Sequence, residues 1–333
     1  MTVETTFNEK FLRGVQMLHG AVFSKSAPLA AGGKKNYILL KYKLLSFKIY
    51  MPGGTKIKII YTTDLHGSWW KYERLFRIAV EQEVHAVING GDLLPFEGGL
   101  FKQGQFISGY LDEYFSRFNS KKIYYLSCPG NDDLKIFDTL YDETCGKYPF
   151  VKNLAQRKIE IRGYEFIGMN WVADYPFQLK DRCRRDTETY EFPHQFGKGV
   201  LSCDGSLKYL DDWFSYAMGL PTLEEELNQL VRPDNMKKCV YIIHMPPCDL
   251  SLDVCSDGRE VGSKAIYQFF EENQPLLSLH GHIHESPVMS GKWFSKLGST
   301  ICIQPGQLDD FTYVLIDLST MTYKRYNEQY KSL

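Results

Sequence analysis

The segment KIKIIYTTDLHG, residues 56–67, decides the interpretation of this 333-residue chain. Its first part, Lys56–Thr63, alternates and is rich in β-branched residues, which predicts a β-strand. Asp64 and His66 follow directly, where the strand would end. Carboxylate and imidazole groups are ligands that suit divalent transition metals. The segment therefore predicts a strand that presents metal ligands at its carboxyl end.

Four further clusters of metal-ligand residue types follow, each just after a run that reads as a strand. They are Gly91-Asp92, Asn131-Asp132-Asp133, His244 and His282-Ile283-His284. Taken singly, these clusters are weak evidence, because an Asp-x-His can cap a helix and a Gly-Asp can form a turn. All five in this order, each at a strand exit, are hard to explain by packing. They predict two divalent metal ions (Mn, Fe, Zn or Co), an arrangement that activates water to attack a phosphorus ester.

The bulk composition excludes several other classes of protein. Hydrophobic residues make up 44% of the chain, enough for a sizeable core, and the net charge of −1 argues against general attraction to nucleic acid or membrane. No apolar run reaches the roughly 18 residues that a membrane helix needs. The eight cysteines form no Cys-x-x-Cys pair, and we find no convincing signal peptide. We therefore expect reduced cysteines and a cytoplasmic location.

The first 50 residues lack the pattern of the rest. Up to residue 55 the chain holds eight Lys or Arg and two Glu, whereas the remainder is acidic on balance. The segment Tyr37–Tyr50 is apolar with interspersed lysines and could be a strand or a short helix. We expect residues 1–50 to be a leader or a non-native extension, with the functional protein starting at Met51; the alternative is a small accessory element. Residues 51–333 are then one domain with an insertion at about 172–220.

From Lys56 onward, strands alternate with helices, which predicts an α/β fold. Arg157–Ile161 and Tyr164–Gly168 flank Arg162-Gly163 and predict a hairpin, which favours mixed rather than wholly parallel sheets. Strands are further predicted at Ala86–Asn89, Lys122–Ser127, Cys239–Ile243, Leu276–Leu279, Thr300–Ile303 and Phe311–Asp317. Helices are predicted at Trp69–Glu83, Gln105–Phe118, Thr222–Val231 with a capping box to Glu225, and Ser263–Asn273 with Ser263 as N-cap.

The five clusters resemble the ordered motifs of the calcineurin-like metallophosphoesterase superfamily, D-x-H, G-D, G-N-H-D/E, H and G-H-x-H. The resemblance spans about residues 56–318, and Leu277–Ser286 looks especially like bacterial and archaeal members. It implies a four-layer sandwich of two mixed β-sheets flanked by helices. It also implies that Asp64, His66, Asp92 and His284 hold one metal, and that Asp92, Asn131, His244 and His282 hold the other, with Asp92 bridging.

The chain departs from the family pattern at Asp132, where the third motif usually has a histidine. By the resemblance, that histidine contacts the phosphate and helps the leaving group to depart, whereas an aspartate would repel an anionic phosphate. We assign catalytic roles to Asp92, Asn131 and Asp132, and expect a bridging hydroxide to hydrolyse phosphodiesters better than monoesters. The substrate would be a small-molecule or nucleotide-like phosphoester.

Weaker candidates lie elsewhere. Lys180, Arg184 and Arg185 in the insertion could bind a phosphate or nucleotide above the metals, or could belong to a solvated loop with charge pairs to Asp181 and Asp186. His194 could replace the missing histidine, and His280 could support the ligands from behind.

Two other functional readings compete with a phosphodiesterase. One is a metal-binding scaffold with weak or no catalysis. The other is a nuclease of the same superfamily, which would need a basic groove that the acidic body does not favour. The sequence does not specify the oligomeric state.

Overall fold

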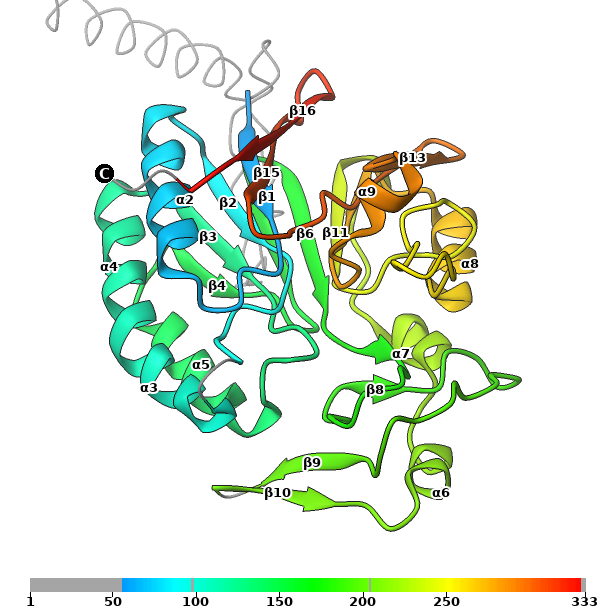
Figure 1. Cartoon of the computed structure of the whole chain (residues 1–333). Coiled ribbons are helices and arrows are strands. Elements are labelled where there is room, and N and C mark those ends of the chain that lie inside the picture. Colours follow the sequence, from blue (N-terminus) through cyan, green and yellow to red (C-terminus); the bar gives the residue numbers. More distant parts are fainter. Residues whose placement is uncertain (1–55, 97–98, 204, 331–333) are drawn as a thin grey trace, which may run out of the picture. The chain divides into compact units, whose positions relative to one another are not determined.

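The computed structural model describes residues 56–96, 99–203 and 205–330, and these residues form two six-stranded sheets packed face to face (Figure 1). The expectations for residues 1–50, including the segment at 37–50 and a start at Met51, lie outside the described residues. Within the described part, no helix is long and apolar enough to cross a membrane.

The first sheet has the strand order β16-β15-β1-β2-β3-β4. Strands β1 to β4 run parallel, while β15 lies antiparallel to β1 and β16 antiparallel to β15. Its strands are β1 (Lys58–Thr62), β2 (Ala86–Asn89), β3 (Tyr124–Ser127), β4 (Val151–Asn153), β15 (Phe311–Asp317) and β16 (Thr322–Glu328).

The second sheet has the order β13-β14-β12-β11-β6-β5. Its inner strands β14, β12, β11 and β6 are parallel, and both edge strands are antiparallel to their neighbours. The strands are β5 (Lys158–Ile161), β6 (Tyr164–Met169), β11 (Cys239–Ile243), β12 (Leu277–Leu279), β13 (Phe294–Leu297) and β14 (Thr300–Ile303). The predicted hairpin and the mixed character of both sheets are confirmed.

Helices cover the outer face of each sheet, which completes the predicted four layers (Figure 1). The first sheet is covered by α2 (Trp69–Glu81), α3 (Gln103–Phe106), the π-helical turn η2 (Ile107–Leu111), α4 (Asp112–Lys121) and α5 (Asp138–Gly146). The second is covered by α7 (Leu223–Gln229) and α8 (Lys264–Asn273); α9 (Ser286–Ser290) follows β12. Short 3₁₀ turns lie at η1 (Leu100–Lys102), η3 (Lys135–Phe137) and η4 (Met236–Lys238).

Strand alternation explains how the core is divided among these layers. Ile59 and Tyr61 of β1 point into the cluster between the two sheets, where they meet Val240 and Ile242 of β11. Ile60, between them in the sequence, points to the opposite face and packs beneath the helices. Both faces are therefore apolar, as expected for strands that are covered on each side.

The local signals for two helices are also confirmed. The Thr222 side chain accepts from the Glu225 backbone N–H while Glu225 reaches back, which forms the predicted capping box on α7. The Ser263 hydroxyl accepts from the Ile266 N–H and caps α8. By contrast, the single helix predicted at 105–118 runs from residue 103 to residue 121 and contains a π-helical turn.

The predicted insertion at 172–220 has secondary structure of its own. It contains the parallel pair β7 (Val172–Ala173) and β8 (Cys183–Arg184), the antiparallel pair β9 (Val200–Cys203) and β10 (Ser206–Tyr209), and α6 (Trp213–Met218). These short elements lie at the carboxyl end of β6, on the side where the ligand loops emerge (Figure 1).

Candidate metal centre

All seven predicted metal ligands lie on loops that follow parallel strands, and both sheets contribute. The first sheet supplies Asp64 and His66 after β1, Asp92 after β2 and Asn131 after β3; the second supplies His244 after β11 and His282 and His284 after β12. Because the carboxyl ends of both sets of strands meet at one edge of the sandwich, segments more than 200 residues apart come together there.

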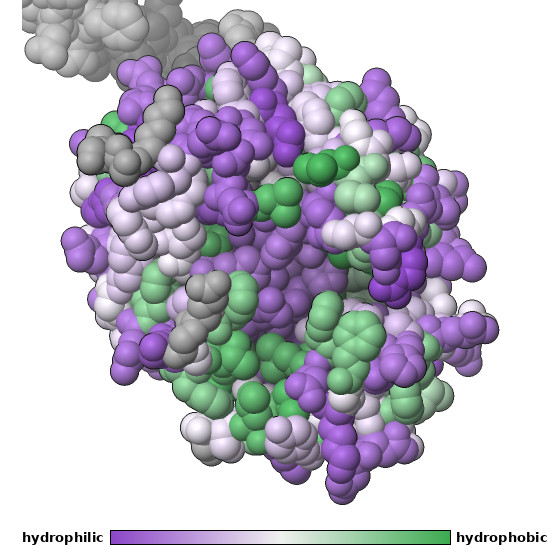
Figure 2. All heavy atoms as spheres, viewed as in Figure 1, coloured by the Kyte–Doolittle hydropathy of each residue, from purple (hydrophilic) through white to green (hydrophobic). Residues whose placement is uncertain are grey.

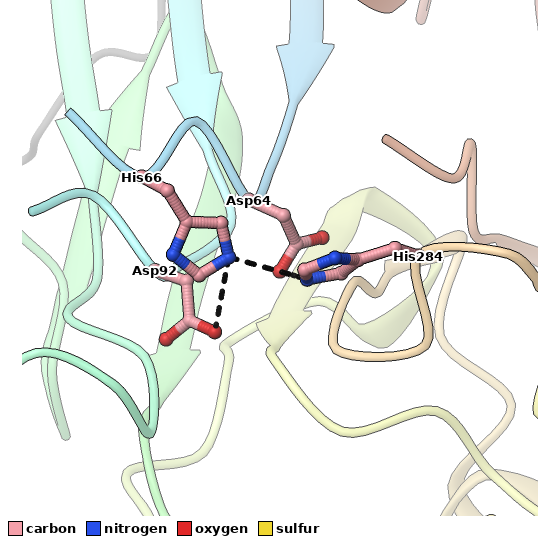
Figure 3. Close-up of side chains that lie close together, drawn as sticks. All are labelled: Asp64, His66, Asp92 and His284. Atoms are coloured by element: carbon pink, nitrogen blue, oxygen red, sulfur yellow. Dashed lines mark hydrogen bonds and ion pairs between the residues drawn. The ribbon is translucent and has the colours of Figure 1, made fainter. Parts of the chain in front are cut away.

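Four of these residues form the first ligand group (Figure 3). Asp64, His66, Asp92 and His284 each offer one ligand atom, and these four atoms lie within 4.8 Å of one another. The Nε2 atoms of His66 and His284 are 3.2 Å apart, and His284 Nε2 is 3.5 Å from an oxygen of Asp64. Their donor atoms therefore converge on one small volume.

The other ligands form a second group beside the first. The Asn131 side-chain oxygen lies 3.0 Å from His244 Nε2 and 2.6 Å from His282 Nδ1. One oxygen of Asp92 lies 3.3 Å from His244 Nε2 and 3.9 Å from His66 Nε2. Asp92 thus stands between the two groups, at the position expected for a bridging ligand.

The chemistry of this donor set fits two divalent ions. The Nε2 atoms of His66 and His284 face each other at 3.2 Å, so both rings direct a nitrogen at the same space. Carboxylate, imidazole and amide donors of this kind suit Mn, Fe, Zn or Co, without selecting among them.

The buried carboxylates of the site favour a positive charge at this position. Burial favours the neutral form of His244, yet the adjacent carboxylates of Asp92 and Asp64 raise its pKa to about 9. Burial and the neighbouring Asp92 and Asp133 raise the pKa of Asp132 to about 7. Buried carboxylates thus draw a proton onto one imidazole, and a divalent cation would meet the same electrostatic demand.

Close backbone packing explains the glycines in two of the motifs. A Cβ atom on Gly281 would lie 2.6 Å from Asp64 Oδ2, and one on Gly130 would lie 2.2 Å from Asp92 Oδ1. Four of the ligand residues have left-handed backbone conformations, with φ of 55° at Asp64, 44° at His66, 49° at Asp92 and 71° at His282. Such strain in non-glycine residues concentrates at functional sites.

Asp133, to which the sequence analysis gave no role, is buried and holds two loops of the site together. Its carboxylate accepts backbone N–H groups from Gly130 at 2.7 Å, Leu93 at 3.0 Å and Leu94 at 2.8 Å. The loops after β2 and β3, which present Asp92 and Asn131, are therefore tied together. The signal in the sequence that could have identified Asp133 is its place as the fourth residue of the Gly-Asn-x-Asp motif.

The ligand groups open into a cavity of about 920 Å³. Asp92, Asn131, Asp132, His282 and His284 line its floor. Figure 2 shows this region as a hydrophilic hollow with apolar atoms along one border. Asp132 is half-buried there, and its Oδ1 accepts from the Asn131 side-chain amide at 2.9 Å. The residue that replaces the family histidine therefore borders the space available to a substrate.

The three basic residues predicted to lie above the metals have other surroundings. Lys180 Nζ is 2.7 Å from Asp174, with both side chains fully buried, and Arg184 Nε is 2.9 Å from Glu226. Arg185 is also buried, and none of the three lines the cavity. The alternative of a solvated loop is wrong, because the insertion folds around these charges. Their role in substrate binding stays a prediction, while the contacts give them a structural one.

The two other histidines singled out in the sequence, His280 and His194, also lie away from the floor of the cavity. His280 is fully buried, with Nδ1 2.9 Å from the Ile243 carbonyl and Nε2 2.9 Å from the Ser278 hydroxyl. It therefore braces β12 against β11 behind the ligands. His194 is exposed and does not line the cavity. That it takes over the role of the histidine missing from the third motif stays a prediction.

We expect Lys180→Met to lower the free energy of unfolding by about 3–5 kcal/mol, because it leaves Asp174 buried without its partner. Urea unfolding measures this loss, and Lys198→Met, an exposed lysine of the same insertion, is the matched control. Unchanged stability combined with a raised KM would contradict the structural role and favour direct substrate binding.

Two mixed sheets with carboxylate, imidazole and amide donors at their shared edge have the fold and the candidate metal site of a metal-dependent hydrolase. The family model described as calcineurin-like phosphoesterase matches residues 57–286, and the chain belongs to this family. Phosphoester hydrolysis that depends on two metal ions is the family's chemistry, as the sequence resemblance implied.

Solved structures support the fold. The protein TT1561 of Thermus thermophilus is 18% identical with a TM-score of 0.50, and the match covers 82% of this chain and 99% of that protein. A second crystal structure, at 20% identity and a TM-score of 0.53, has the same two coverages. The comparison with curated proteins finds no match.

Proposed function

We propose that the chain is a dinuclear metal-dependent phosphodiesterase. Asp64, His66, Asp92 and His284 would hold one ion, and Asp92, Asn131, His244 and His282 the other. The observation that carries this proposal is the position of Asp92, which lies 3.9 Å from an imidazole of the first ligand group and 3.3 Å from one of the second. When bound, two divalent ions lower the pKa of water to give a nucleophile and neutralise charge on the phosphoryl oxygens.

The protein's own residues would divide the remaining work. Asp92 holds both halves of the site at a fixed separation, and its second oxygen is fixed by the Asp132 backbone N–H at 2.8 Å. Asn131 supplies an uncharged oxygen, so the site is not over-neutralised. Asp133, through its three backbone hydrogen bonds, prevents the two loops from moving apart.

The preference for diesters rests on Asp132. A phosphodiester carries one negative charge and a phosphomonoester up to two, so the repulsion from a carboxylate at the cavity floor is smaller for the diester. An aspartate also lacks the imidazolium that would assist a poor leaving group. Diesters with good leaving groups are therefore the proposed substrates, rather than monoesters.

The alternatives have less support. A scaffold that no longer hydrolyses anything would not require all seven donors to converge. A nuclease would need cationic side chains beside the metals, whereas Arg259 is the single Lys or Arg among the described residues that line the cavity. We therefore propose a small-molecule or nucleotide-like substrate rather than a polymer.

We also propose a cytoplasmic setting. It is supported by the eight cysteines, all of which are free thiols in the structure, with Cys128, Cys239 and Cys302 buried in the core.

The first test is hydrolysis of bis(p-nitrophenyl) phosphate by the full chain with added Mn²⁺. We expect turnover that is abolished by a chelator and restored by excess Mn²⁺, because the carboxylates of the site require cations to bind an anionic ester. Metal-loaded protein that binds the ions but shows no turnover would favour the scaffold over the enzyme.

A further inference from the structure

Three aromatic side chains of the insertion lead outward from the metal centre. The Tyr175 ring lies 5.7 Å from the His282 ring, Phe177 lies 6.1 Å from Tyr175, and Phe196 lies 5.7 Å from Phe177, measured between centroids. We call Tyr175, Phe177 and Phe196 the aromatic ladder. All three line the cavity that contains the ligands, so the ladder forms one wall of it.

A fourth ring stands beside the other ligand group. Phe96, which follows the β2 loop, packs edge-on against His66 with centroids 4.9 Å apart, and it also lines the cavity. Aromatic rings therefore flank the candidate metal centre next to one imidazole of each ligand group.

The outer rings of the ladder are unusually open to solvent. Phe177 is 63% exposed and Phe196 is 60% exposed, although they lie against each other. Single exposed apolar residues are common on proteins, but contiguous exposed aromatic rings in a cavity usually mark a binding surface. Figure 2 shows apolar atoms gathered along the border of the hydrophilic hollow.

The base of the ladder is held in place by buried contacts. The Tyr175 hydroxyl donates to the Leu179 carbonyl at 2.6 Å, and Lys180 Nζ lies 4.8 Å from the Tyr175 ring while it pairs with Asp174. The ladder is therefore fixed at the metal end and free at the solvent end, as a preformed wall for a ligand would be.

The charges around the cavity restrict what can lie on that wall. Its lining includes six carboxylates besides Asp92; Asp174 is paired with Lys180 and Asp257 with Arg259, which leaves Asp132, Glu191, Glu260 and Glu285 without a Lys or Arg partner in the described part of the lining. Arg259, the one Lys or Arg among the described lining residues, is already bonded to Asp257 at 2.7 Å. A second phosphate on the substrate would meet repulsion and no available cation, which disfavours nucleoside diphosphates and triphosphates.

We propose that the aromatic ladder binds an aromatic ester arm of a singly charged phosphodiester whose phosphate lies over Asp92 and Asn131. The inference rests on the proposed function for the place of the phosphate, and adds the class of substrate. Stacking on Phe177 and Phe196 selects the arm, and the acidic surroundings select against further phosphates.

Calorimetric binding to the manganese-loaded full chain tests this without turnover. The probes are diphenyl phosphate and dimethyl phosphate, which carry the same single charge and differ in their arms. We expect diphenyl phosphate to bind at least about tenfold more tightly, and the double variant Phe177→Ala/Phe196→Ala to lose about tenfold in affinity for it alone. Tyr209→Ala, an exposed aromatic of the same insertion that does not line the cavity, is the control.

Equal affinities for the two probes, or a preference that survives in the double variant, would overturn the inference. Tighter binding of methyl phosphocholine than of diphenyl phosphate would also overturn it, because the acidic rim would then be selecting a cation. Melting temperatures verify that the variants are folded. Failure of the proposed function would be distinguishable from failure of this inference. In that case bis(p-nitrophenyl) phosphate would not be hydrolysed, while the preference for binding diphenyl phosphate would remain.

Discussion

Replacing Asp92 by asparagine should remove bound metal and phosphodiesterase activity together. Asp92 lies 3.9 Å from the His66 imidazole of the first ligand group and, closer than Asp64, 3.3 Å from the His244 imidazole of the second, so its loss should weaken both ion sites at once. Two-metal stabilisation of a phosphoryl transition state is worth several kcal/mol, and each step of about 1.4 kcal/mol is tenfold in rate. We therefore expect kcat to fall on the order of 10³-fold or more.

The measurement is elemental analysis of protein purified with manganese supplied, together with the rate on bis(p-nitrophenyl) phosphate. Asparagine retains the oxygen that accepts the Asp132 N–H, so the loop should keep its conformation. Asp211→Asn, an exposed aspartate of the insertion, should retain both metal and activity. A variant at position 92 that keeps two ions per chain and its full rate would remove Asp92 from the bridging role.

The second large effect concerns Asp132→His, which should raise monoester turnover more than diester turnover. The half-buried Asp132 borders the cavity floor, and nearby divalent ions would favour its charged form. A histidine removes that charge and can protonate a leaving oxygen. General acid assistance is typically worth about 10²–10⁴-fold, and poor leaving groups depend on it most.

The quantity to compare is kcat/KM for p-nitrophenyl phosphate and bis(p-nitrophenyl) phosphate in each protein, at equal metal content. Asp132→Asn separates the two causes, because it removes the charge without adding an acid. We expect it to recover part of the monoester rate and Asp132→His to recover more. If the ratio of the two rates is the same in all three proteins, position 132 has no part in substrate choice, and His194 becomes the residue to test.

The parts of the fold that the sequence predicted well are those with a local signal. The strand expected at Lys56–Thr63 appears as β1 at Lys58–Thr62, and the caps at Thr222 and Ser263 are formed as expected. Apolar alternation and capping depend on residues a few positions apart, so they can be read without knowledge of the tertiary structure. The candidate metal ligands could be predicted because their order along the chain is itself a pattern.

The insertion was harder to predict because its stability depends on partners far away in the sequence. Arg182 looks like a surface residue, yet it is buried, with its side chain donating to the Gly130 carbonyl at 2.9 Å and pairing with Asp138. Arg184 pairs with Glu226 across 42 residues. A charged side chain is buried only where such a partner exists, and composition alone cannot reveal the pairing.

The left-handed backbone at Asp64, His66, Asp92 and His282 limits how the metal preference of this protein could be re-engineered. Asp, Asn and His are the non-glycine residues that tolerate this conformation most readily, and they are also the donors present here. Exchanging one for Cys or Glu, to favour a softer or a harder metal, would change the donor and strain the backbone in the same step. New metal selectivity is therefore more accessible at Asn131, His244 and His284, whose φ values are not positive.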